Sequence, residues 1–258
     1  MASETGAHSE RVSALRELRT VKGRREQGRF AFEGATLLDE AVRCGTVVDE
    51  LYVLDSRYEQ ARVAHDLEAR GTAVYLVDER TAARISDLDT PTGLVAVTAI
   101  RPRSLAALFA DEGLVLVLAD LNDPGNAGTL LRSAEAFGAN GVVFGSLGVD
   151  PYHPKVVRGA MGAIFRVPFA EADPAALGEA AAAAGATVLG LATAGAPLCA
   201  SVLPRRCALI VGHERRGLGP WEAICAQTLT IPMKAPTESL NAGVAGSIAL
   251  YEASKSRS

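Results

Sequence analysis

The apolar run LVLVLAD at residues 114–120 limits the folds open to this chain more than any other stretch. Six consecutive apolar residues are typical of a strand that is buried on both faces, as strands are inside a parallel sheet. Further runs of strand length occur at residues 141–145, 187–193, 208–212 and 229–232. Patterns typical of helices occur at about 127–139, 174–185, 220–226 and 241–254. This alternation predicts an α/β fold built on a parallel sheet.

A second, smaller α/β pattern precedes this region. Helices are predicted at residues 9–29, 32–45 and 56–71, and strands at 48–55, 73–78 and 90–100. A chain of 258 residues has room for one large domain, or for a domain of about 150 residues and a smaller one. We predict four parts: a basic N-terminal extension or helix (1–28), a small α/β domain (29–100), a linker (101–113) and a larger domain (114–258).

Charge and cysteine content exclude several classes of protein. The net charge of −4 gives no global signal for nucleic acid binding, so that argument depends on local patches. Residues 9–29 carry seven basic and three acidic side chains, and residues 151–170 carry three basic ones and no acidic one. The four cysteines lack C-x-x-C spacing and the four histidines are scattered, so we expect a reduced cytoplasmic protein without a metal site.

The chain also lacks the sequence features of secretion and membrane insertion. Its first nine residues are polar, and no apolar run reaches 18 residues. We therefore expect neither a signal peptide nor a membrane-spanning helix.

Three strand ends in the larger predicted domain are rich in glycine, asparagine and charge. They are LNDPGNAGTLLRS after the first strand, GHERRG after the strand at 208–212, and PMKAPTESLN after the last strand. Ligands of open parallel sheets bind beyond the carboxyl ends of the strands. Taken singly, the first segment is explained by a capped helix and the second by a solvated loop. A capping box does not explain the third, because Glu238 precedes the expected cap, Asn241.

In this order the three segments resemble the motifs of a known family. They contain N-x-G-x-x-x-R from Asn126 to Arg132, G-x-E from Gly212 to Glu214, and I-P-M followed by E-S-L-N up to Asn241. This pattern resembles the SpoU family of RNA methyltransferases over residues 114–254. Residues 154–168 are similar to the family's segment between the first two motifs. Residues 29–100 resemble, more loosely, its small substrate-binding domain.

The resemblance implies a fold and an activity. The fold is α/β, a parallel sheet with a C-terminal deep trefoil knot and a small N-terminal α/β RNA-binding domain. The activity is transfer of a methyl group from S-adenosylmethionine to a ribose 2′-hydroxyl in RNA, with ribosomal RNA favoured over transfer RNA. A non-catalytic RNA-binding protein with the same fold stays an alternative. A nicotinamide-dependent dehydrogenase is disfavoured because the G-x-G-x-x-G fingerprint is absent.

The motif positions carry the family's roles over to this sequence. By resemblance, Arg132 is the catalytic arginine, with Asn126 as its positioning partner and Glu214 orienting it. Because arginine is too basic to lose its proton readily, its main expected role is to stabilise phosphate and alkoxide charge, and a role as base stays open. Ser239 and Asn241 are expected to hold the catalytic loop and the substrate ribose. No metal is needed, since the methyl donor is already activated.

Two further sets of residues follow from the resemblance and from the charge pattern. The residues expected at the donor are Thr193, Val211, Gly212, Ile231, Met233 and Leu240. The missing Cβ of Gly212 is expected to let the adenosine approach the backbone. The residues expected to contact RNA phosphates are Arg16, Arg19, Lys22, Arg24, Arg25, Arg29, Lys155 and Arg158.

The family resemblance implies a homodimer that forms through the knotted domain, beside the last helix. Residues 241–255 place Val244, Ile248 and Tyr251 at helical spacing, with small residues between them. Apolar and small residues on several faces of a helix indicate burial on more than one side. Members of the family that this chain resembles pair through this region.

Overall fold

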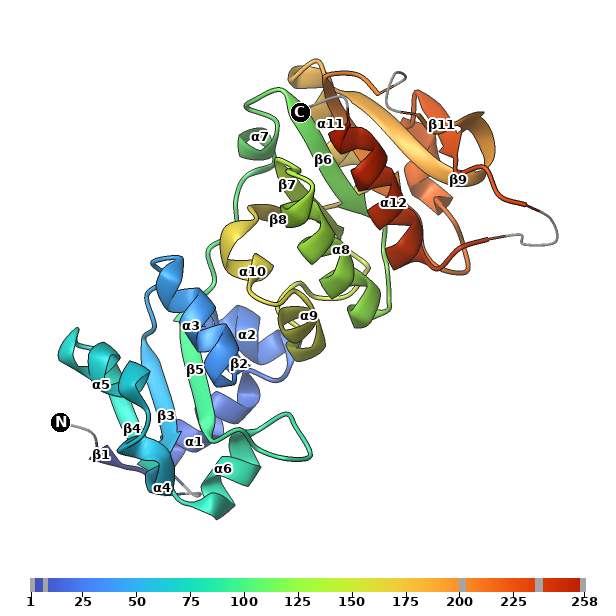
Figure 1. The fold of residues 1–258 in the computed structure, drawn as a ribbon. Coiled ribbons are helices and arrows are strands. Elements are labelled where there is room, and N and C mark those ends of the chain that lie inside the picture. The colour runs from blue at the N-terminus through green and yellow to red at the C-terminus, as the bar shows by residue number, and fades with distance from the viewer. Residues whose placement is uncertain (1–2, 7–8, 200–202, 235–238, 256–258) are drawn as a thin grey trace. The chain divides into compact units, whose positions relative to one another are not determined.

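The computed structural model describes residues 3–6, 9–199, 203–234 and 239–255. The chain divides into two compact units (Figure 1). The N-terminal unit consists of Met1–Arg101 and Tyr152–Phe165, and the C-terminal unit consists of Pro102–Pro151 and Arg166–Ser258. Within the described ranges, no helix combines the length and apolar character that crossing a membrane requires.

The N-terminal unit is built on a mixed five-stranded sheet of order β1-β4-β3-β5-β2. Strands β1, β4 and β3 are parallel to one another, whereas β5 is antiparallel to both β3 and β2. The strands are β1 Ser3–Glu4, β2 Arg29–Glu33, β3 Glu50–Leu54, β4 Ala73–Val77 and β5 Leu94–Ala99. The helices of Met1–Arg101 are α1 Glu10–Glu17, α2 Val21–Gln27, α3 Ala35–Arg43, α4 Asp55–Tyr58, α5 Arg62–Ala69 and α6 Glu79–Ile85.

The basic stretch at 9–29 is two helices and the start of a strand, not the single helix that the sequence predicted. Thr20 begins α2 by accepting a hydrogen bond from the Gly23 backbone N–H at 3.0 Å. The turn between α1 and α2 is tight, because a Cβ on Gly23 would lie 2.1 Å from the Glu17 carbonyl oxygen. Val12, Leu15 and Leu18 belong to the core of this unit, so the stretch is part of the domain rather than an extension of it.

Residues 152–165 also belong to the N-terminal unit, although the sequence assigned them to the larger domain. They contain α9 (Pro154–Gly159) and the start of α10 (Ala163–Arg166). The ring centroid of Tyr152 lies 4.6 Å from that of Phe30, and Phe165 lies 5.0 Å from Phe32. The two chain segments of the unit therefore share one aromatic cluster.

The C-terminal unit confirms the predicted parallel sheet. Its six strands are all parallel, in the order β11-β9-β10-β6-β7-β8. They are β6 Gly113–Leu118, β7 Gly141–Gly145, β8 Phe169–Ala172, β9 Thr187–Pro197, β10 Arg206–Val211 and β11 Gln227–Thr230. Leu116 and Val117 on β6 and Leu209 and Ile210 on β10 are 0% exposed, as expected for strands covered on both faces.

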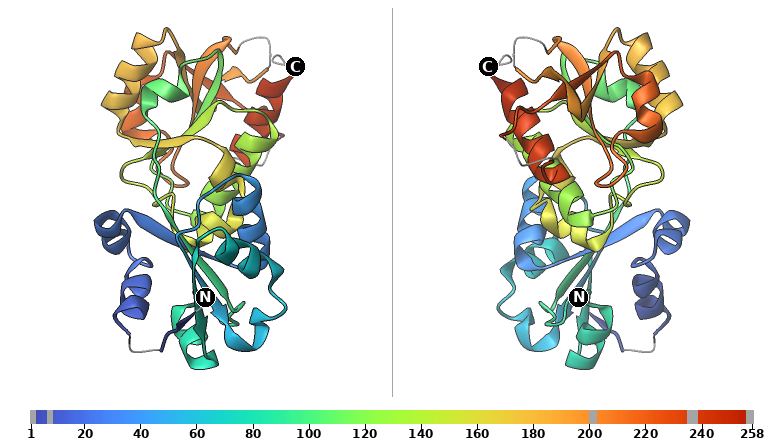
Figure 2. Two further views of the ribbon diagram at one scale, coloured as in Figure 1. Left: turned by 90° about the vertical axis from the view of Figure 1, so that its left-hand side faces the viewer. Right: turned by 90° about the vertical axis from the view of Figure 1, so that its right-hand side faces the viewer.

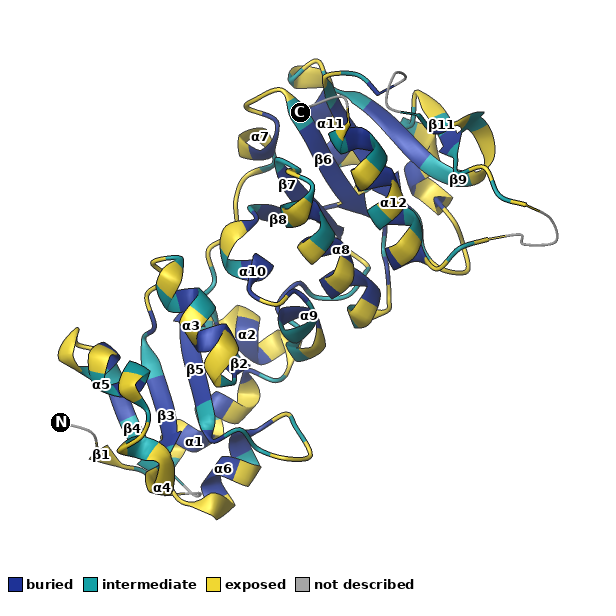
Figure 3. Cartoon of the chain, in the orientation of Figure 1, coloured by how far each residue is buried: buried dark blue, intermediate teal, exposed yellow. Residues whose placement is uncertain are grey.

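Helices cover both faces of this sheet. Figure 2 shows α8 (Pro124–Ala136) and α12 (Ala242–Ser254) on one side and α11 (Pro174–Ala183) on the other. The described part of this unit also contains α7 Leu105–Leu108 and a 3-10 helix, η2, at Gly219–Ile224. The strands at the centre are buried, and the helices alternate between buried and exposed residues (Figure 3).

Close packing of α12 on α8 explains the glycines in the sequence AGVAGS. A Cβ on Gly246 would lie 2.4 Å from Leu130 Cδ2 and 3.0 Å from Val211 Cγ2. The hydroxyls of Ser133 on α8 and Ser247 on α12 are 2.8 Å apart and share a hydrogen bond. Glycine weakens a helix, but here it lets the two helices approach closely.

Candidate active site

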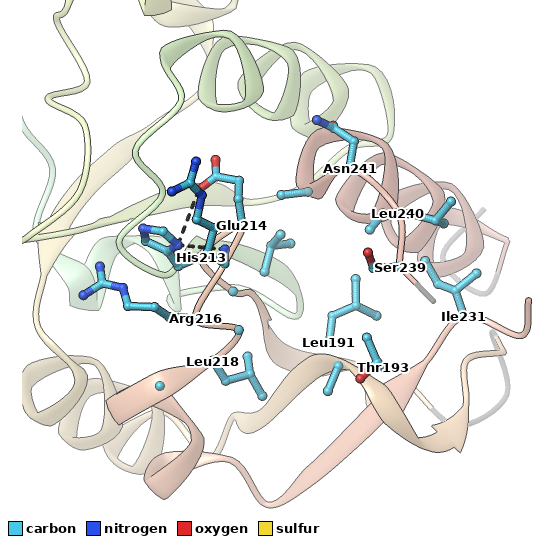
Figure 4. A pocket seen from close by; sticks show the side chains of 18 of the residues that line it. Leu191, Thr193, His213, Glu214, Arg216, Leu218, Ile231, Ser239, Leu240 and Asn241 are labelled. Atoms are coloured by element: carbon cyan, nitrogen blue, oxygen red, sulfur yellow. Dashed lines mark hydrogen bonds and ion pairs between the residues drawn. The ribbon is translucent and has the colours of Figure 1, made fainter. Parts of the chain in front are cut away.

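The strand ends of the C-terminal unit surround a cavity of about 760 Å³ (Figure 4). The cavity lies beside Val211, the last residue of β10, and beside Leu191–Thr193 of β9. At this level β11 jumps from pairing with Gly190 to pairing with Ala196, so β9 bulges away from its neighbour. The remaining walls come from the turn after β10, the segment after β11 and the start of α12.

All six residues predicted at the donor line this cavity, namely Thr193, Val211, Gly212, Ile231, Met233 and Leu240. Glu214, Ser239 and Asn241 line it as well. Glu238, which a capping box does not explain, lies outside the described residues. The second and third motifs therefore meet at one cavity.

The cavity has an apolar side and a charged side. Leu191, Ile231 and Leu240 lie on one side, and His213, Glu214 and Arg216 lie on the other (Figure 4). A planar heterocycle is stabilised against apolar side chains, and phosphate or ribose groups are stabilised by charge and hydrogen bonds.

Glycine at 212 is needed for the turn that follows β10. A Cβ on Gly212 would lie 2.4 Å from the Gly217 carbonyl carbon and 2.8 Å from the Leu218 nitrogen. His213 and Gly217 exchange two backbone hydrogen bonds, of 2.8 and 2.9 Å, which close this turn. Turn closure therefore requires this glycine by itself, and the approach of adenosine stays a prediction.

Glu214 joins the first motif to the second. Its carboxylate accepts a hydrogen bond of 2.9 Å from Asn126 Nδ2, and bonds of 3.4 and 3.3 Å from the backbone N–H groups of Asn122 and Asp123. Burial disfavours the ionised carboxylate, but the bonds from Asn126, its own backbone, Asn122 and Asp123 outweigh burial and lower the pKa of Glu214. The ionised carboxylate thus ties the start of α8 to the turn after β10.

The first and third motifs meet at Gly243. Asn241 begins α12, where its Oδ1 accepts a hydrogen bond of 3.2 Å from the Val244 backbone N–H. A Cβ on Gly243 would lie 3.1 Å from the Oδ1 atoms of both Asn126 and Asn241. Both amides therefore converge on a position where any side chain would crowd them.

Arg132 does not share the direction of Asn126. It is exposed on α8, it does not line the cavity, and among the described residues it has no ion-pair partner. Six residues of α-helix amount to about 600°, so the two side chains point about 120° apart. Glu214 binds Asn126 instead of Arg132 in this chain, contrary to the expected arrangement.

Some of the predicted RNA-contacting residues are buried or paired within the chain, and others are exposed. Arg24 is only 1% exposed and donates a hydrogen bond of 2.8 Å to the Leu18 carbonyl oxygen, so its burial removes it from a surface role. Arg19 pairs with Asp87 at 2.9 Å, and Arg29 pairs with Glu50 at 2.8 Å. Arg158 is half-buried, while Arg16, Lys22, Arg25 and Lys155 are exposed.

Asp120 is a residue at this strand edge to which the sequence analysis assigned no role. It follows β6 with a φ of 53°, a backbone conformation that costs energy in residues other than glycine. Its carboxylate accepts hydrogen bonds from Trp221 Nε1 at 2.8 Å and from the Leu147 backbone N–H at 3.2 Å. The strained aspartate thus fixes η2 and the turn after β7 to the end of β6. Its position directly after an apolar strand was the signal available in the sequence.

Comparison with known proteins identifies the family. The SpoU rRNA Methylase family matches residues 113–251, and the MRM3-like substrate binding domain matches residues 9–96. The first match covers more than half of the chain, which therefore belongs to the SpoU rRNA methylase family. This confirms the resemblance that the three motifs predicted.

Individual relatives match this chain over nearly its whole length. The 23S rRNA (guanosine(2553)-2'-O)-methyltransferase RlmP of Bacillus subtilis is 32% identical over 249 residues, 95% of this chain and 96% of that protein. The 23S rRNA (uridine(2479)-2'-O)-methyltransferase of Streptomyces viridochromogenes is 29% identical and covers 91% of this chain and 85% of its own length. The crystal structure of an AdoMet-bound rRNA methyltransferase from Sinorhizobium meliloti matches with a TM-score of 0.84 and 29% identity over 98% of both chains.

Proposed function

We propose that this chain transfers a methyl group from S-adenosylmethionine to a ribose 2′-hydroxyl of ribosomal RNA. The observation that carries the proposal is the convergence of all three motifs, with Glu214 bound to Asn126 at 2.9 Å and Gly243 between Asn126 and Asn241. The relatives named as 23S rRNA 2'-O-methyltransferases, and the AdoMet-bound neighbour, support the substrate and the donor.

The cavity fits the proposed donor. Its volume of about 760 Å³ lies within the range of pockets that enclose small molecules. The apolar side chains of Leu191, Ile231 and Leu240 suit the faces of an adenine ring. Thr193 and Ser239 also line the cavity, and their hydroxyls suit ribose and amino-acid groups. When bound, S-adenosylmethionine supplies a methyl group on an already activated sulfonium.

The protein must therefore align the acceptor hydroxyl and help it lose its proton. Ionised Glu214 holds Asn126 and the start of α8 in place. Asn241 and Ser239 line the opposite side of the cavity. We assign Arg132 to the stabilisation of phosphate and alkoxide charge, because a guanidinium keeps its proton at neutral pH. This role requires RNA, or a second copy of the chain, to bring Arg132 and the acceptor together.

A homodimer through α12 is part of the proposal. Val244, Ile248 and Tyr251 are 48%, 38% and 50% exposed, on the helix whose other face packs on α8 and β10. Tyr251 also contacts the Phe137 ring, with the two centroids 5.7 Å apart. Because each is already about half buried, covering it with a second copy would stabilise a pair by about 1 kcal/mol for each side chain.

The mass in solution tests the dimer. Light scattering at micromolar concentration is expected to give about twice 26.9 kDa. The double variant Val244→Ser, Ile248→Ser should shift the protein to the mass of one chain. A fully active wild-type species of that single mass would contradict the dimer.

The trefoil knot stays a prediction from the family resemblance.

The substrate is tested by mapping 2′-O-methyl groups in RNA from cells with and without the gene. One ribosomal RNA nucleotide is expected to lose its methyl group when the gene is absent, and to regain it with purified protein and S-adenosylmethionine. Loss of a methyl group from transfer RNA instead would show that transfer RNA, and not ribosomal RNA, is the substrate. No change in either RNA would support the non-catalytic alternative.

A further inference from the structure

We propose that Arg215 and Arg216, on the turn that closes β10, bind phosphates of the acceptor RNA strand at the mouth of the cavity. The inference rests on the proposed function, and it adds RNA contacts from the C-terminal unit to those expected from the N-terminal unit. Both side chains line the cavity and both residues are exposed. Neither guanidinium forms an ion pair with any side chain in the described part of the chain.

The turn that carries the two arginines is rigidly held. Two backbone hydrogen bonds between His213 and Gly217 close it. His213 fixes it internally, because its Nδ1 accepts a hydrogen bond of 3.0 Å from the Arg215 backbone N–H. The other ring nitrogen lies 3.0 Å from the side-chain amide of Asn122, in the loop between β6 and α8. A preorganised turn loses little conformational freedom when its arginines bind a ligand.

The acid on the same turn does not neutralise the arginines. Glu214 is engaged by Asn126 and by the backbone N–H groups of Asn122 and Asp123. These bonds lie on the side of the loop that leads into α8. The lining also contains the exposed Glu222, but among the described residues neither acid forms an ion pair with Arg215 or Arg216, so both guanidinium groups stay available to an anion. Guanidinium groups bind phosphate oxygens through paired hydrogen bonds, which suits a nucleic acid backbone.

The position of the arginines favours RNA over the donor as their partner. Figure 4 shows the Arg216 guanidinium on the side of the cavity opposite to Ile231 and Leu240, the residues assigned to adenine. The donor carries a single carboxylate, whereas an RNA strand offers one phosphate for each nucleotide. Two adjacent exposed arginines match a repeating anion better than one carboxylate.

The test is the salt dependence of RNA binding by the full-length protein. The probe is a fluorescein-labelled single-stranded RNA oligonucleotide of mixed sequence, and its Kd is measured by anisotropy over a range of salt concentrations. Each phosphate contact on a single strand contributes about 0.7 to the slope of log K against log salt. The double variant Arg215→Gln, Arg216→Gln is expected to lower that slope by about 1.4.

A matched control separates a local contact from a general loss of charge. Arg103→Gln, Arg205→Gln removes the same charge from two exposed arginines of the C-terminal unit that lie outside the cavity lining. This control is expected to keep the wild-type slope. Arg215→Lys, Arg216→Lys keeps the charge and is expected to recover most of the slope, which a misfolded turn would not allow.

The outcomes distinguish this inference from the proposed function. Donor binding, measured by calorimetry, should stay within about twofold in the glutamine variant. If that variant keeps the wild-type salt slope, or loses donor affinity instead, the arginines do not bind RNA and the inference is overturned. A wild-type protein that binds RNA and the donor but methylates nothing would overturn the proposed function and leave the phosphate contact intact.

Discussion

The two units of this chain differ in the direction of their strands, and the difference shows where a ligand site forms. In the C-terminal sheet all six strands are parallel, so every strand ends at the same edge. Segments after β10 and β11 meet there around a cavity of about 760 Å³, and Glu214 binds the segment after β6 to them. In the N-terminal sheet β5 is antiparallel to its neighbours, so the loops are divided between two edges. Strand direction thus brings all six carboxyl ends of the C-terminal sheet to one edge, whereas in the N-terminal sheet β5 ends at the edge opposite to the other strands.

The polar side chains of the two units also have different partners. In the N-terminal unit, buried Glu33 accepts hydrogen bonds from Ser86 Oγ at 2.9 Å and from the Thr92 backbone N–H at 2.8 Å. Burial disfavours the ionised form of Glu50, but hydrogen bonds from Tyr52 and Arg29 outweigh burial and lower the pKa of Glu50. These carboxylates satisfy groups within the unit and stabilise it. In the C-terminal unit Arg215 and Arg216 stay available at a cavity, which is the arrangement that binding requires.

The largest expected effect comes from removing the N-terminal unit. Deleting residues 1–101 should abolish RNA methylation, while the remaining chain still binds S-adenosylmethionine within a few-fold, because every donor-lining residue lies in the C-terminal unit. The deletion also exposes Tyr152 and Phe165, which lose Phe30 and Phe32 as partners. Phe165→Ser is therefore expected to raise the solubility of the truncated chain. Calorimetry and a labelled methyl-transfer assay measure the two activities, and near-normal methylation by the truncated chain would contradict the division.

Arg132→Ala is expected to lower methyl transfer by about 100- to 1,000-fold, the cost of losing one charge-stabilising group at a transition state. Donor affinity should change little, because Arg132 lies outside the cavity lining. The control is Arg205→Ala, whose side chain is 88% exposed and pairs only with Glu112 among the described residues. Single-turnover rates with saturating donor measure the effect. Wild-type rates for Arg132→Ala would remove it from the mechanism.

Glu214→Gln is expected to lower turnover by up to about 100-fold, because Asn126 and the start of α8 lose the ionised carboxylate that positions them. The variant should also change how stability depends on pH. The folded pKa of Glu214 is below its ordinary value of 4.5, so its contribution is present above that value and is lost as pH falls through the folded pKa. The difference in unfolding free energy between wild type and variant should therefore shrink in acid. Urea titrations at several pH values measure it, and a constant difference would refute the assignment.

The smallest effects are expected from replacing one helix N-cap residue in each unit. Asn241 caps α12, and Asp78 caps α6 by accepting a hydrogen bond of 2.7 Å from the Thr81 backbone N–H. Asn241→Ala should cost about 1 kcal/mol of stability, and Asp78→Ala should also lower stability. Only Asn241→Ala should also lower turnover, because only Asn241 lines the cavity. Thermal unfolding and methyl-transfer rates measured together test this, and equal loss of activity in both variants would contradict a site role for Asn241.

Much of the C-terminal unit was predictable from local sequence. The apolar run at 114–120 predicted a strand buried on both faces, and β6 has that burial. The six positions that the family resemblance implies for the donor line one cavity, because parallel strands deliver their loops to one edge. That they bind the donor stays a prediction. The stretch at 9–29 was less predictable. Its helical spacing is continuous, and only the close approach of Gly23 to Glu17 divides it into two helices.

The sequence by itself determined the class of fold and the family, since buried strands and ordered motifs are properties of neighbouring residues. The tertiary structure decided which polar groups face each other. Glu214 meets Asn126 across 88 residues, and Arg24 is buried within its own unit although Lys22 and Arg25 are exposed. It also decided that residues 152–165 join the N-terminal unit. Such pairings depend on how whole elements pack, and packing energies between distant segments leave no periodic trace in the sequence.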